Sequence, residues 1–426
     1  MVILMGKNFE AILPLIILLA LGNSPIAPVL AESVAKNAAT TPKPLSVSVK
    51  RALTYLVSQQ QENGGWSQGT ESANMGTSMD NIAKTANVGD TCMAGLALVQ
   101  SGSYPNKGEY AKNLSKAAEF VCGKVEKSDD TSLSVTDLRT TRIQMKLGPN
   151  IDTFLASLFL SEIKTHMPSK DTQVRVAKAL DKVINKMERN QNSDGQFTGK
   201  LASASAGGAG WAPIHAQAMA TKALNRAKQE GAVVSDEALA KAQTYAEKSY
   251  DGKTRNFNLV GAASVPLYAA GAALSGLQQS INTGKMYEQE ARKVLESKNS
   301  TKKDREVAQA RIDRLASASS VQTNATIAVT ERLNDKGFIQ GFGCNGGEEF
   351  LSYLDISEAL KENDPKKWQE YDKKMSENLG RIQNQDGSWM GQHCITSKTF
   401  VTAAAILVLT VDRESSSRAD KIRRRA

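Results

Sequence analysis

Residues 383–389 read Gln-Asn-Gln-Asp-Gly-Ser-Trp, and they separate an amphipathic pattern from a strongly apolar one. Two related stretches occupy residues 59–66 (Gln-Gln-Gln-Glu-Asn-Gly-Gly-Trp) and residues 191–197 (Gln-Asn-Ser-Asp-Gly-Gln-Phe). In each, a helix is expected to end at an Asx-Gly turn, because glycine tolerates the positive φ that such a turn needs. The aromatic residue then packs back over the junction. The sequence therefore contains an internal repeat of helix, turn and helix.

Two kinds of helix pattern alternate along the chain. The amphipathic kind, expected on the outside, covers residues 46–60, 110–126, 172–190, 236–250, 305–333 and 366–383. The more uniformly apolar kind, expected to be buried on all sides, covers residues 88–100, 151–164, 212–228, 259–278, 348–361 and 396–411. No sustained alternation of period two indicates a sheet. We therefore predict an all-α fold, an (α/α)6 toroid of six inner and six outer helices, with an open solenoid as the alternative.

The Gln…Asp-Gly-Ser-Trp element resembles the repeat of squalene–hopene cyclases, protein prenyltransferase β subunits and thioester-containing complement-type domains. These proteins share the α/α-toroid, so the resemblance implies a distant member of the terpenoid cyclase and protein prenyltransferase superfamily. It covers most of residues 46–411 by helix pattern, and its motif matches are the three turns. It bears on the fold more than on the activity, because one fold hosts many activities.

The N-terminal segment predicts export. Lys7 precedes an apolar run at residues 11–21, and the small residues that follow predict a cleaved signal peptide over residues 1–31, with an uncleaved anchor as the alternative. Residues 32–45 are expected to form a linker rich in small residues and proline. The mature protein is therefore predicted to be periplasmic or extracellular.

The toroid domain is predicted to span residues 46–411, with one insertion. Inter-pair spacing is larger between the fourth and fifth apolar patterns, where residues 282–318 are dense in charge at helical spacing. This segment is expected to form a protruding helical hairpin. It is either functional or simply a solvated insertion. Residues 412–426 are expected to be a basic, disordered tail.

Charge is unevenly distributed along the 426 residues. The chain carries 53 Lys and Arg against 44 Asp and Glu, a net charge of +9, and its 41% hydrophobic content excludes a largely disordered protein. Residues 285–314 contribute a net +3 and residues 413–426 a net +4. The toroid itself is nearly balanced, so we predict no specific nucleic-acid partner. The C-terminal Arg cluster is expected to contact an anionic surface.

The strongest candidate site lies in residues 341–353, where a Gly-rich turn precedes the fifth apolar pattern. Parallel inner helices of a toroid open their N-termini on one face, where polar side chains line the mouth of a central cavity and anions are favoured. Glu348 and Glu349 are therefore candidates for general acid/base catalysis or for binding a cation. The alternative is that they only stabilise the helix N-terminus. His393, at the start of the next inner helix, is the best histidine candidate.

His215 and Asp152 are weaker catalytic candidates near the starts of other inner helices, and for His215 a hydrogen-bonded core position is the alternative. The motifs on which the known activities of these families depend are missing from this sequence. Prenyltransferases place a histidine where His393 stands, but their Asp-x-Cys zinc pair is missing. The Asp-rich DxDD motif of the cyclases is absent, and residues 343–349 only echo the Cys-Gly-Glu-Gln run of the thioester domains. We predict no metal and no cofactor.

The four cysteines predict two disulfides in an exported protein, although four cysteines allow three connectivities. In a toroid, Cys344 and Cys394 precede adjacent inner helices on one face. Cys92 starts an inner helix, and Cys122 ends an outer helix on the same face. We therefore expect Cys92–Cys122 and Cys344–Cys394 bonds at the rim.

Two classes of function remain open. The first is a central cavity that binds or acts on a lipid-like or cell-envelope ligand through Glu348, Glu349 and His393. The second is a non-catalytic scaffold that binds a protein or an envelope polymer. A polysaccharide lyase or hydrolase is a further alternative, but such enzymes usually carry aromatic platforms, and aromatic residues are only 5% of this chain.

Overall fold

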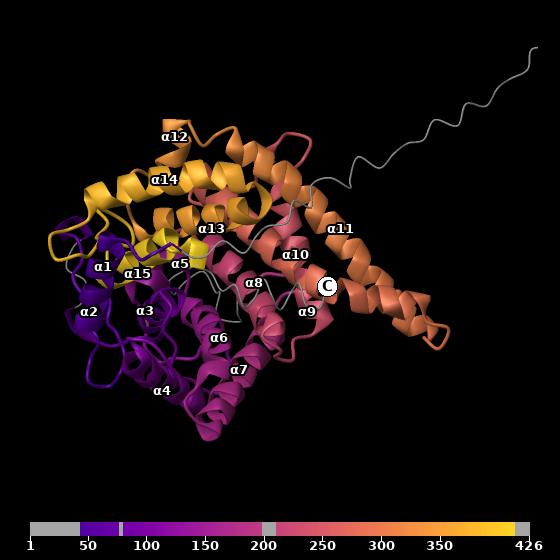
Figure 1. Cartoon of the computed structure of the whole chain (residues 1–426), viewed down its shortest axis with the longest axis horizontal. Helices are drawn as coiled ribbons and strands as arrows, with labels where there is room; N and C mark the ends of the chain where they lie inside the picture. The colour runs from indigo at the N-terminus through magenta and orange to yellow at the C-terminus, as the bar shows by residue number, and fades with distance from the viewer. Residues whose placement is uncertain (1–42, 76–79, 198–209, 414–426) are drawn as a thin grey trace, which may run out of the picture. The chain divides into compact units, whose positions relative to one another are not determined.

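A computed structural model describes residues 43–75, 80–197 and 210–413 (Figure 1). The predicted signal peptide, most of the linker and residues 414–426 of the tail lie outside the described residues. Within these ranges the chain is mostly helical, which confirms the prediction of an all-α protein. The strands there, β1 (Tyr250–Asp251) and β2 (Asn256–Phe257), form one short antiparallel pair.

Six helices of the described ranges are buried on nearly all sides, as their apolar sequences require, except that the fourth is partly exposed along its last fifteen residues. They are α3 (Val88–Gln100), α6 (Ile151–Ile163), α8 (Ile214–Gln229), α10 (Pro266–Glu296), α13 (Gly347–Asn363) and α15 (Lys398–Leu409). Each packs against two others of this set. The contacts run from α3 to α6, α8, α10, α13 and α15, and α15 packs against α3 again.

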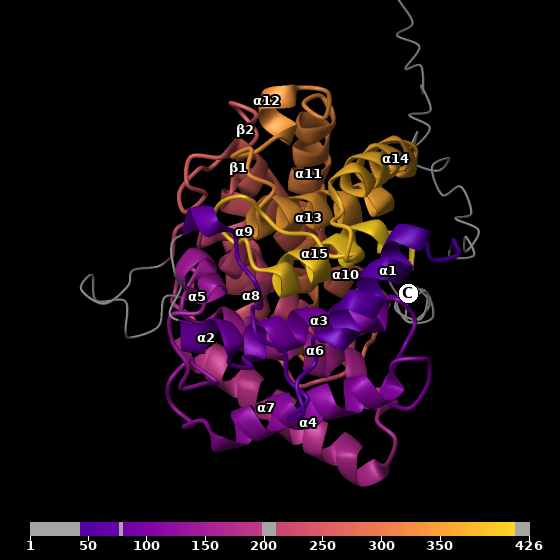
Figure 2. The same ribbon diagram turned by 90° about the vertical axis from the view of Figure 1, so that its left-hand side faces the viewer.

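Six amphipathic helices cover the buried ones. They are α1 (Val47–Ser58), α4 (Ala111–Lys127), α7 (Lys170–Asn190), α9 (Asp236–Lys248), α11 (Lys302–Thr330) and α14 (Pro365–Ile382). Each packs on a buried helix: α1 on α15, α4 on α3, α7 on α6, α9 on α8 and α10, α11 on α10, and α14 on α13. Figures 1 and 2 show α4 and α7 side by side next to α3 and α6.

Short helices occupy the connections. They are α2 (Asp80–Lys84), α5 (Arg142–Leu147), α12 (Lys336–Ile339) and the 3-10 turns η1 (Ala73–Met75), η2 (Lys164–His166) and η3 (Val411–Arg413). Helix α5 begins at a capping box, because the Thr141 hydroxyl accepts from the backbone of Gln144 while the Gln144 side chain accepts from that of Thr141. It packs against α6 and α8. This short helix positions two cations that border the candidate site.

The three repeat turns have the same geometry. Their glycines, Gly64, Gly195 and Gly387, have φ angles of 86°, 89° and 89°. A Cβ at any of them would overlap the backbone of another outer helix, at Lys116 of α4, Lys241 of α9 and Arg51 of α1 respectively. Glycine is therefore required both for the backbone conformation and for the close approach. Each turn joins one outer helix to another: α1 to α4, α7 to α9, and α14 to α1.

The glutamine of each turn reinforces the same junction. Gln191 donates to the Ala238 carbonyl at 3.1 Å, and Gln383 donates to the Ser48 carbonyl at 2.9 Å. In the first turn the equivalent residue is Gln60, which donates to the Asn113 carbonyl at 2.9 Å, and not Gln59 as the sequence suggested. The repeated glutamine thus connects an outer helix to its neighbour.

The aromatic residues of the turns pack as predicted. Trp66 and Trp389 are buried, and each indole N–H donates to a carbonyl ten residues earlier, that of Leu56 at 2.7 Å and that of Leu379 at 2.8 Å. Phe197 lies 5.4 Å from the Phe154 ring. A buried Trp needs a partner for its N–H, and the end of the preceding helix supplies it.

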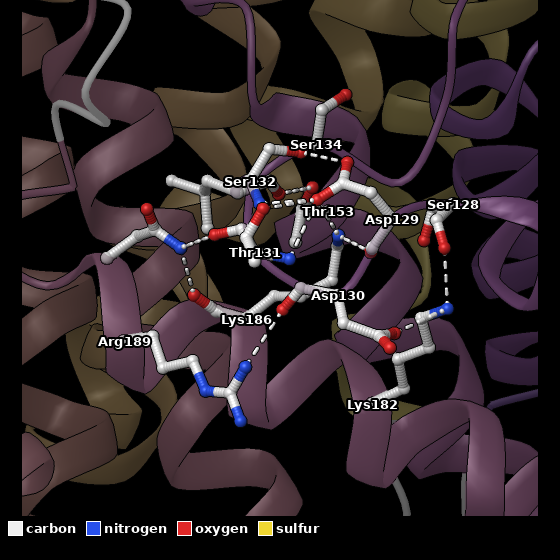
Figure 3. Close-up of polar contacts among 12 residues, drawn as sticks. Ser128, Asp129, Asp130, Thr131, Ser132, Ser134, Thr153, Lys182, Lys186 and Arg189 are labelled. Carbon is white, nitrogen blue, oxygen red and sulfur yellow. Dashed lines mark hydrogen bonds and ion pairs between the residues drawn. The ribbon is translucent and has the colours of Figure 1, made fainter.

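The loop after α4 is held against α7 by charged side chains (Figure 3). Lys186, only 1% exposed, donates to the carbonyl of Asp129. Lys182 donates to the Ser128 carbonyl at 2.6 Å, and Arg189 donates to the Asp130 carbonyl at 3.1 Å. The buried cation on α7 is thus satisfied by a loop that has no secondary structure of its own.

The segment 282–318 lies in two long helices, α10 and α11, which are joined by the turn at residues 297–301. Helix α11 begins at a capping box formed by Thr301 and Asp304. In Figure 1 the end of this hairpin lies beyond the other labelled helices. The insertion is therefore an extension of one buried helix and one outer helix.

Candidate functional site

The first turn of α13 places two carboxylates in the interior, and both Glu348 and Glu349 are 0% exposed. The Glu349 carboxylate accepts from the Tyr268 hydroxyl at 2.7 Å, from the Gly346 N–H at 2.9 Å and from the Phe342 N–H at 3.0 Å. Three donors of this kind match the acceptor capacity of an ionised carboxylate. Burial, together with the charge of Glu349, raises the pKa of Tyr268 far above its usual value, so the phenol remains a donor.

Glu348 has a different environment. One carboxyl oxygen accepts from the Ile395 N–H at 3.1 Å, and the other has no hydrogen-bond partner among the described residues. Burial, and next the charge of Cys394, raises the pKa of Glu348 well above its usual value. This environment favours the neutral acid. Adjacent carboxyl groups in one helical turn are therefore in opposite surroundings.

Cys394 lies in the turn before α15 with a φ of 67°, a left-handed conformation that is costly for a residue with a Cβ. Such strain is concentrated at functional sites. Its sulfur is 3.0 Å from Nδ1 of His393. The interaction with the neighbouring Cys344, and next that with His393, outweigh burial and lower the pKa of Cys394 to about 6. This environment favours the thiolate form of Cys394.

The Cys344 thiol connects the cysteine and carboxylate parts of the site. Its thiol donates to the Glu349 carboxylate, with the sulfur 3.3 Å from Oε2, and it also interacts with Cys394. The hydrogen bond to Cys394, burial and the charge of Glu349 all raise the pKa of Cys344. The protonated Cys344 thus stabilises the thiolate of Cys394.

Two cations of α5 contribute a positive field. Arg142 makes a bidentate ion pair with Glu71 at 2.7 Å, and both side chains are buried. The hydrogen bonds that Arg142 donates to Glu71 raise the pKa of Arg142, and the charges of Glu348 and Cys394 add to this. Lys146 lies one turn later and lowers the pKa of Cys394. The thiolate is therefore supported by cations that come from a distant part of the sequence.

Aromatic rings gather at the same place, although the chain contains few of them. The Trp211 ring lies 5.3 Å from Phe342 and 6.1 Å from Tyr268, and Lys146 lies 5.3 Å above it. Phe342 is 50% exposed, and its ring is 5.6 Å from that of His393, which is also exposed. The exposed Phe342 ring is thus linked to the buried Cys394 through His393.

Of the other two sequence candidates, His215 borders the site through Tyr268, whereas Asp152 has separate surroundings. His215 is buried 5.0 Å from the Tyr268 ring, and neither ring nitrogen has a partner in the described part of the chain. Burial lowers its pKa to about 3, so the imidazole is neutral. Asp152 accepts from the Gly89 N–H at 2.9 Å and from the Gln144 amide at 2.7 Å. Its hydrogen bonds hold α3 and α5 to α6, and do not involve the carboxylates of α13.

All four cysteines are free thiols, so neither the Cys92–Cys122 nor the Cys344–Cys394 disulfide is present. Cys92 and Cys122 are buried in the core on α3 and α4, and burial raises the pKa of each, that of Cys122 to about 12. Cys344 and Cys394 instead interact as free cysteines, and this interaction raises the pKa of Cys344 and lowers that of Cys394. Sequence reasoning missed this role because it assigned both residues to a disulfide.

The sequence offered one signal for the reactive cysteine, the pair His393-Cys394 in a turn close to Gly391. It offered none for Tyr268, Arg142 and Lys146, because nothing in their local sequence indicates that the fold brings them to α13 and α15.

No protein-family model matches the sequence, and no curated protein matches it. In residues 43–75, 80–197 and 210–413, no group of three or more His, Cys, Asp or Glu side chains is placed to hold a metal ion. No helix of those same ranges is long and apolar enough to cross a membrane. The function must therefore be argued from the site itself.

Proposed function

We propose that the described helices form an (α/α)6 toroid, distantly related to the terpenoid cyclases and protein prenyltransferases. The support is the closed series of contacts from α3 through α15 and back to α3, with one outer helix against each buried one. The three equivalent turns, each joining two outer helices, add to it. An open solenoid would leave its first and last buried helices apart.

The site at the starts of α13 and α15 is proposed to bind or act on a lipid-like or cell-envelope ligand. The observation that carries this proposal is Cys394, a thiolate held in a strained turn by Cys344 and His393. Thiolates are strong nucleophiles, and a lowered pKa is typical of reactive cysteines. The exposed Phe342 suits an apolar part of the ligand, and Lys146 suits an anionic part.

The chemistry proposed for an enzyme is nucleophilic. The Cys394 thiolate attacks an electrophilic carbon, and the electron pair leaves with the departing group. Glu348, favoured as a neutral acid and with one oxygen unpartnered among the described residues, is placed to give that group a proton. Glu349 keeps Tyr268 and Cys344 in position and acts on the reaction only through them.

Export is part of the proposal. It rests on the apolar run at residues 11–21 and on the small residues before residue 32. The Arg cluster in residues 413–426 would then contact an anionic envelope surface. Mass spectrometry of the mature protein tests this, because cleavage after Ala31 gives a chain that begins at Glu32.

A non-catalytic scaffold is the second candidate. It is favoured by the burial of the site, since Cys394 and Glu348 are both 0% exposed. A ligand can reach the sulfur of Cys394 only after side chains around it move. In a scaffold the thiolate would be inert, and a protein or envelope polymer would bind elsewhere on the surface.

A binding screen with lipids and envelope glycans tests the two candidates on the full chain. The variants are Cys394→Ser, Glu348→Gln and His393→Ala, with the exposed Glu62→Gln as the control. A ligand of the site should bind at least about tenfold more weakly to Cys394→Ser and His393→Ala, the cost of about one lost hydrogen bond to a charged group. Unchanged binding in all three variants rejects the site, and a ligand that binds all four proteins equally supports the scaffold.

A further inference from the structure

The base of the α10–α11 hairpin forms a small cavity that is partly open to solvent and remote in sequence from Cys394. Its volume is about 50 Å³, and α8, α9, α10 and α11 all contribute to its wall. The charged and aromatic side chains that line it are Lys228, Asp236, Tyr287, Arg311 and Arg314. The segment that appears in the sequence as an insertion therefore supplies three of these five side chains.

Cations outnumber carboxylates in this wall. Lys228, Arg311 and Arg314 carry three positive charges, whereas Asp236 supplies one carboxylate. The Asp236 carboxylate forms an ion pair with Arg311, whose Nη2 lies 2.7 Å from Oδ2. Glu247, which accepts from the cavity residue Gln243 at 2.7 Å, is the other carboxylate nearby. The wall itself keeps an excess of positive charge.

Arg314 is the unsatisfied member of the set. Among the described residues its guanidinium has no ion pair within 4 Å and no hydrogen bond. Burial lowers its pKa, the charge of Arg311 lowers it further, and Asp236 opposes both. A partly buried cation in a cavity that is open to solvent keeps water as its partner. A bound anion replaces that water with charge-assisted hydrogen bonds.

Tyr287 keeps two of the cations in place. Lys228 lies 5.7 Å and Arg311 lies 5.9 Å from the centre of its ring. The Lys228 ammonium also donates to the Val234 carbonyl at 2.9 Å, which leaves two of its three protons for a ligand. Two of the three cations thus lie near one ring, which restricts them and reduces the entropy lost on binding.

We infer that this cavity binds one small tetrahedral oxyanion of the phosphate class. A volume of about 50 Å³ admits roughly one such ion or a few waters. The guanidinium of Arg314 suits bidentate contact with two oxyanion oxygens, and Lys228 supplies a point charge to a third. The ion is either free phosphate or the phosphate group of a larger ester, since both present the same oxygens.

The test is calorimetric titration of the full chain with inorganic phosphate, at an ionic strength held constant with chloride. Arg314→Gln should weaken binding at least about tenfold, and Lys228→Gln is a second variant in case the first is poorly folded. Arg292→Gln is the matched control, because Arg292 lies on the same hairpin, is exposed and pairs with Glu288. Its affinity should stay within about twofold of that of the unmodified chain.

Two results overturn the inference: no phosphate binding beyond the chloride control, or equal weakening in Arg314→Gln and Arg292→Gln. A parallel titration with glycerol phosphate distinguishes the sources. Equal binding of the ester supports a phosphate group on a larger molecule, and binding of inorganic phosphate alone supports the free ion.

Discussion

Two polar regions of this protein use charge in opposite ways. In the loop at residues 128–134, the Asp129 carboxylate accepts from the backbone and hydroxyl of Ser132 and from Thr131, and these bonds lower its pKa (Figure 3). At the start of α13, burial raises the pKa of Glu348, which keeps one unpartnered oxygen. The loop satisfies its charges, whereas the site leaves a carboxyl group under-satisfied.

The same contrast holds for the groups around each carboxylate. Lys186 is buried but donates to the loop, so its burial stabilises a connection between α4 and α7. Cys394 is buried in a strained conformation and is stabilised as an anion by Cys344 and His393. Stability commonly conflicts with function where a site needs strain. Substitutions in the loop should therefore reduce stability, and those in the site should change reactivity.

The largest effect is expected in the labelling of the native protein with iodoacetamide. At pH 7 the Cys394 thiol, with a pKa of about 6, is mostly ionised. Cys122, with a pKa of about 12, has about one thiolate in 10⁵ molecules. Peptide mass spectrometry over a pH series should show Cys394 modified first, with a midpoint near pH 6.

Cys344→Ala is the matched variant for this experiment. It removes the strongest donor to the thiolate, so the midpoint for Cys394 should move upward. The assignment of Cys394 as the reactive cysteine is wrong if Cys122 is labelled as fast as Cys394 in the native protein. It is also wrong if the labelling midpoint of Cys394 is the same in Cys344→Ala as in the unmodified chain.

The next largest effect is a loss of stability in the loop. Lys186→Met keeps the aliphatic packing but leaves the Asp129 carbonyl without its donor, at a cost of about 1–3 kcal/mol in the free energy of unfolding. Lys178→Met, on the same helix but exposed, should change it by less than about 0.5 kcal/mol. Urea denaturation measures both. Equal effects, or a changed labelling rate of Cys394, would remove the distinction between the regions.

Effects of opposite sign in the two regions are expected from pH. Glu348 has a raised pKa in the folded state, so the native protein binds more protons than the unfolded chain above about pH 4.5. Its contribution to stability therefore falls as the pH rises, by at most about 1.4 kcal/mol per unit. Glu348→Gln removes this loss. The free energy of unfolding of the variant, relative to that of the unmodified chain, should therefore increase from pH 5 to pH 8.

Asp129→Asn is the comparison for that measurement. The pKa of Asp129 is lowered on folding, so its stabilising contribution is complete above about pH 3.8 and is lost as the pH falls through the folded-state value. The variant should be less stable at neutral pH, and the difference should shrink in acid. If both variants shift in the same direction, the two carboxyl groups do not differ as described.

The helices were predictable because their signals are local. The period of apolar residues and the Asx-Gly turns identify α1, α7 and α14 within a few residues. The start of α10 was misplaced by seven residues, because residues 259–265 are apolar enough to resemble helix. There, Ala263 and Ser264 have positive φ and the chain turns before Pro266 begins the helix.

The site was predictable only in part. Glu348, Glu349 and His393 stand next to glycine-rich turns, which is a local signal. The roles of Cys344 and Cys394 depend on which sulfur receives a proton and which backbone is strained, and neither is encoded locally. Lys146 comes from a helix more than two hundred residues away in the sequence. Its effect on the thiolate follows only from the packing of α5 against α6 and α8.

The smallest effect is expected for His393→Ala. The hydrogen bond from His393 lowers the pKa of Cys394 less than that from Cys344 does. Its loss should raise the labelling midpoint by less than about one pH unit, which is a two- to fivefold slower reaction at pH 6. The substitution also uncovers the sulfur, and this opposes the slower reaction.

The variant Phe342→Ala distinguishes an effect on the pKa of Cys394 from an effect on the access of the reagent to its sulfur. The Phe342 ring lies 5.6 Å from that of His393 and covers the same site, but it makes no hydrogen bond to the sulfur. It should raise the plateau rate of labelling and leave the midpoint unchanged, whereas His393→Ala should raise the midpoint. If both variants change only the plateau rate of labelling, His393 shields the Cys394 sulfur and does not lower its pKa. The contact between His393 and Cys394 would then be purely structural, like the contacts of the loop.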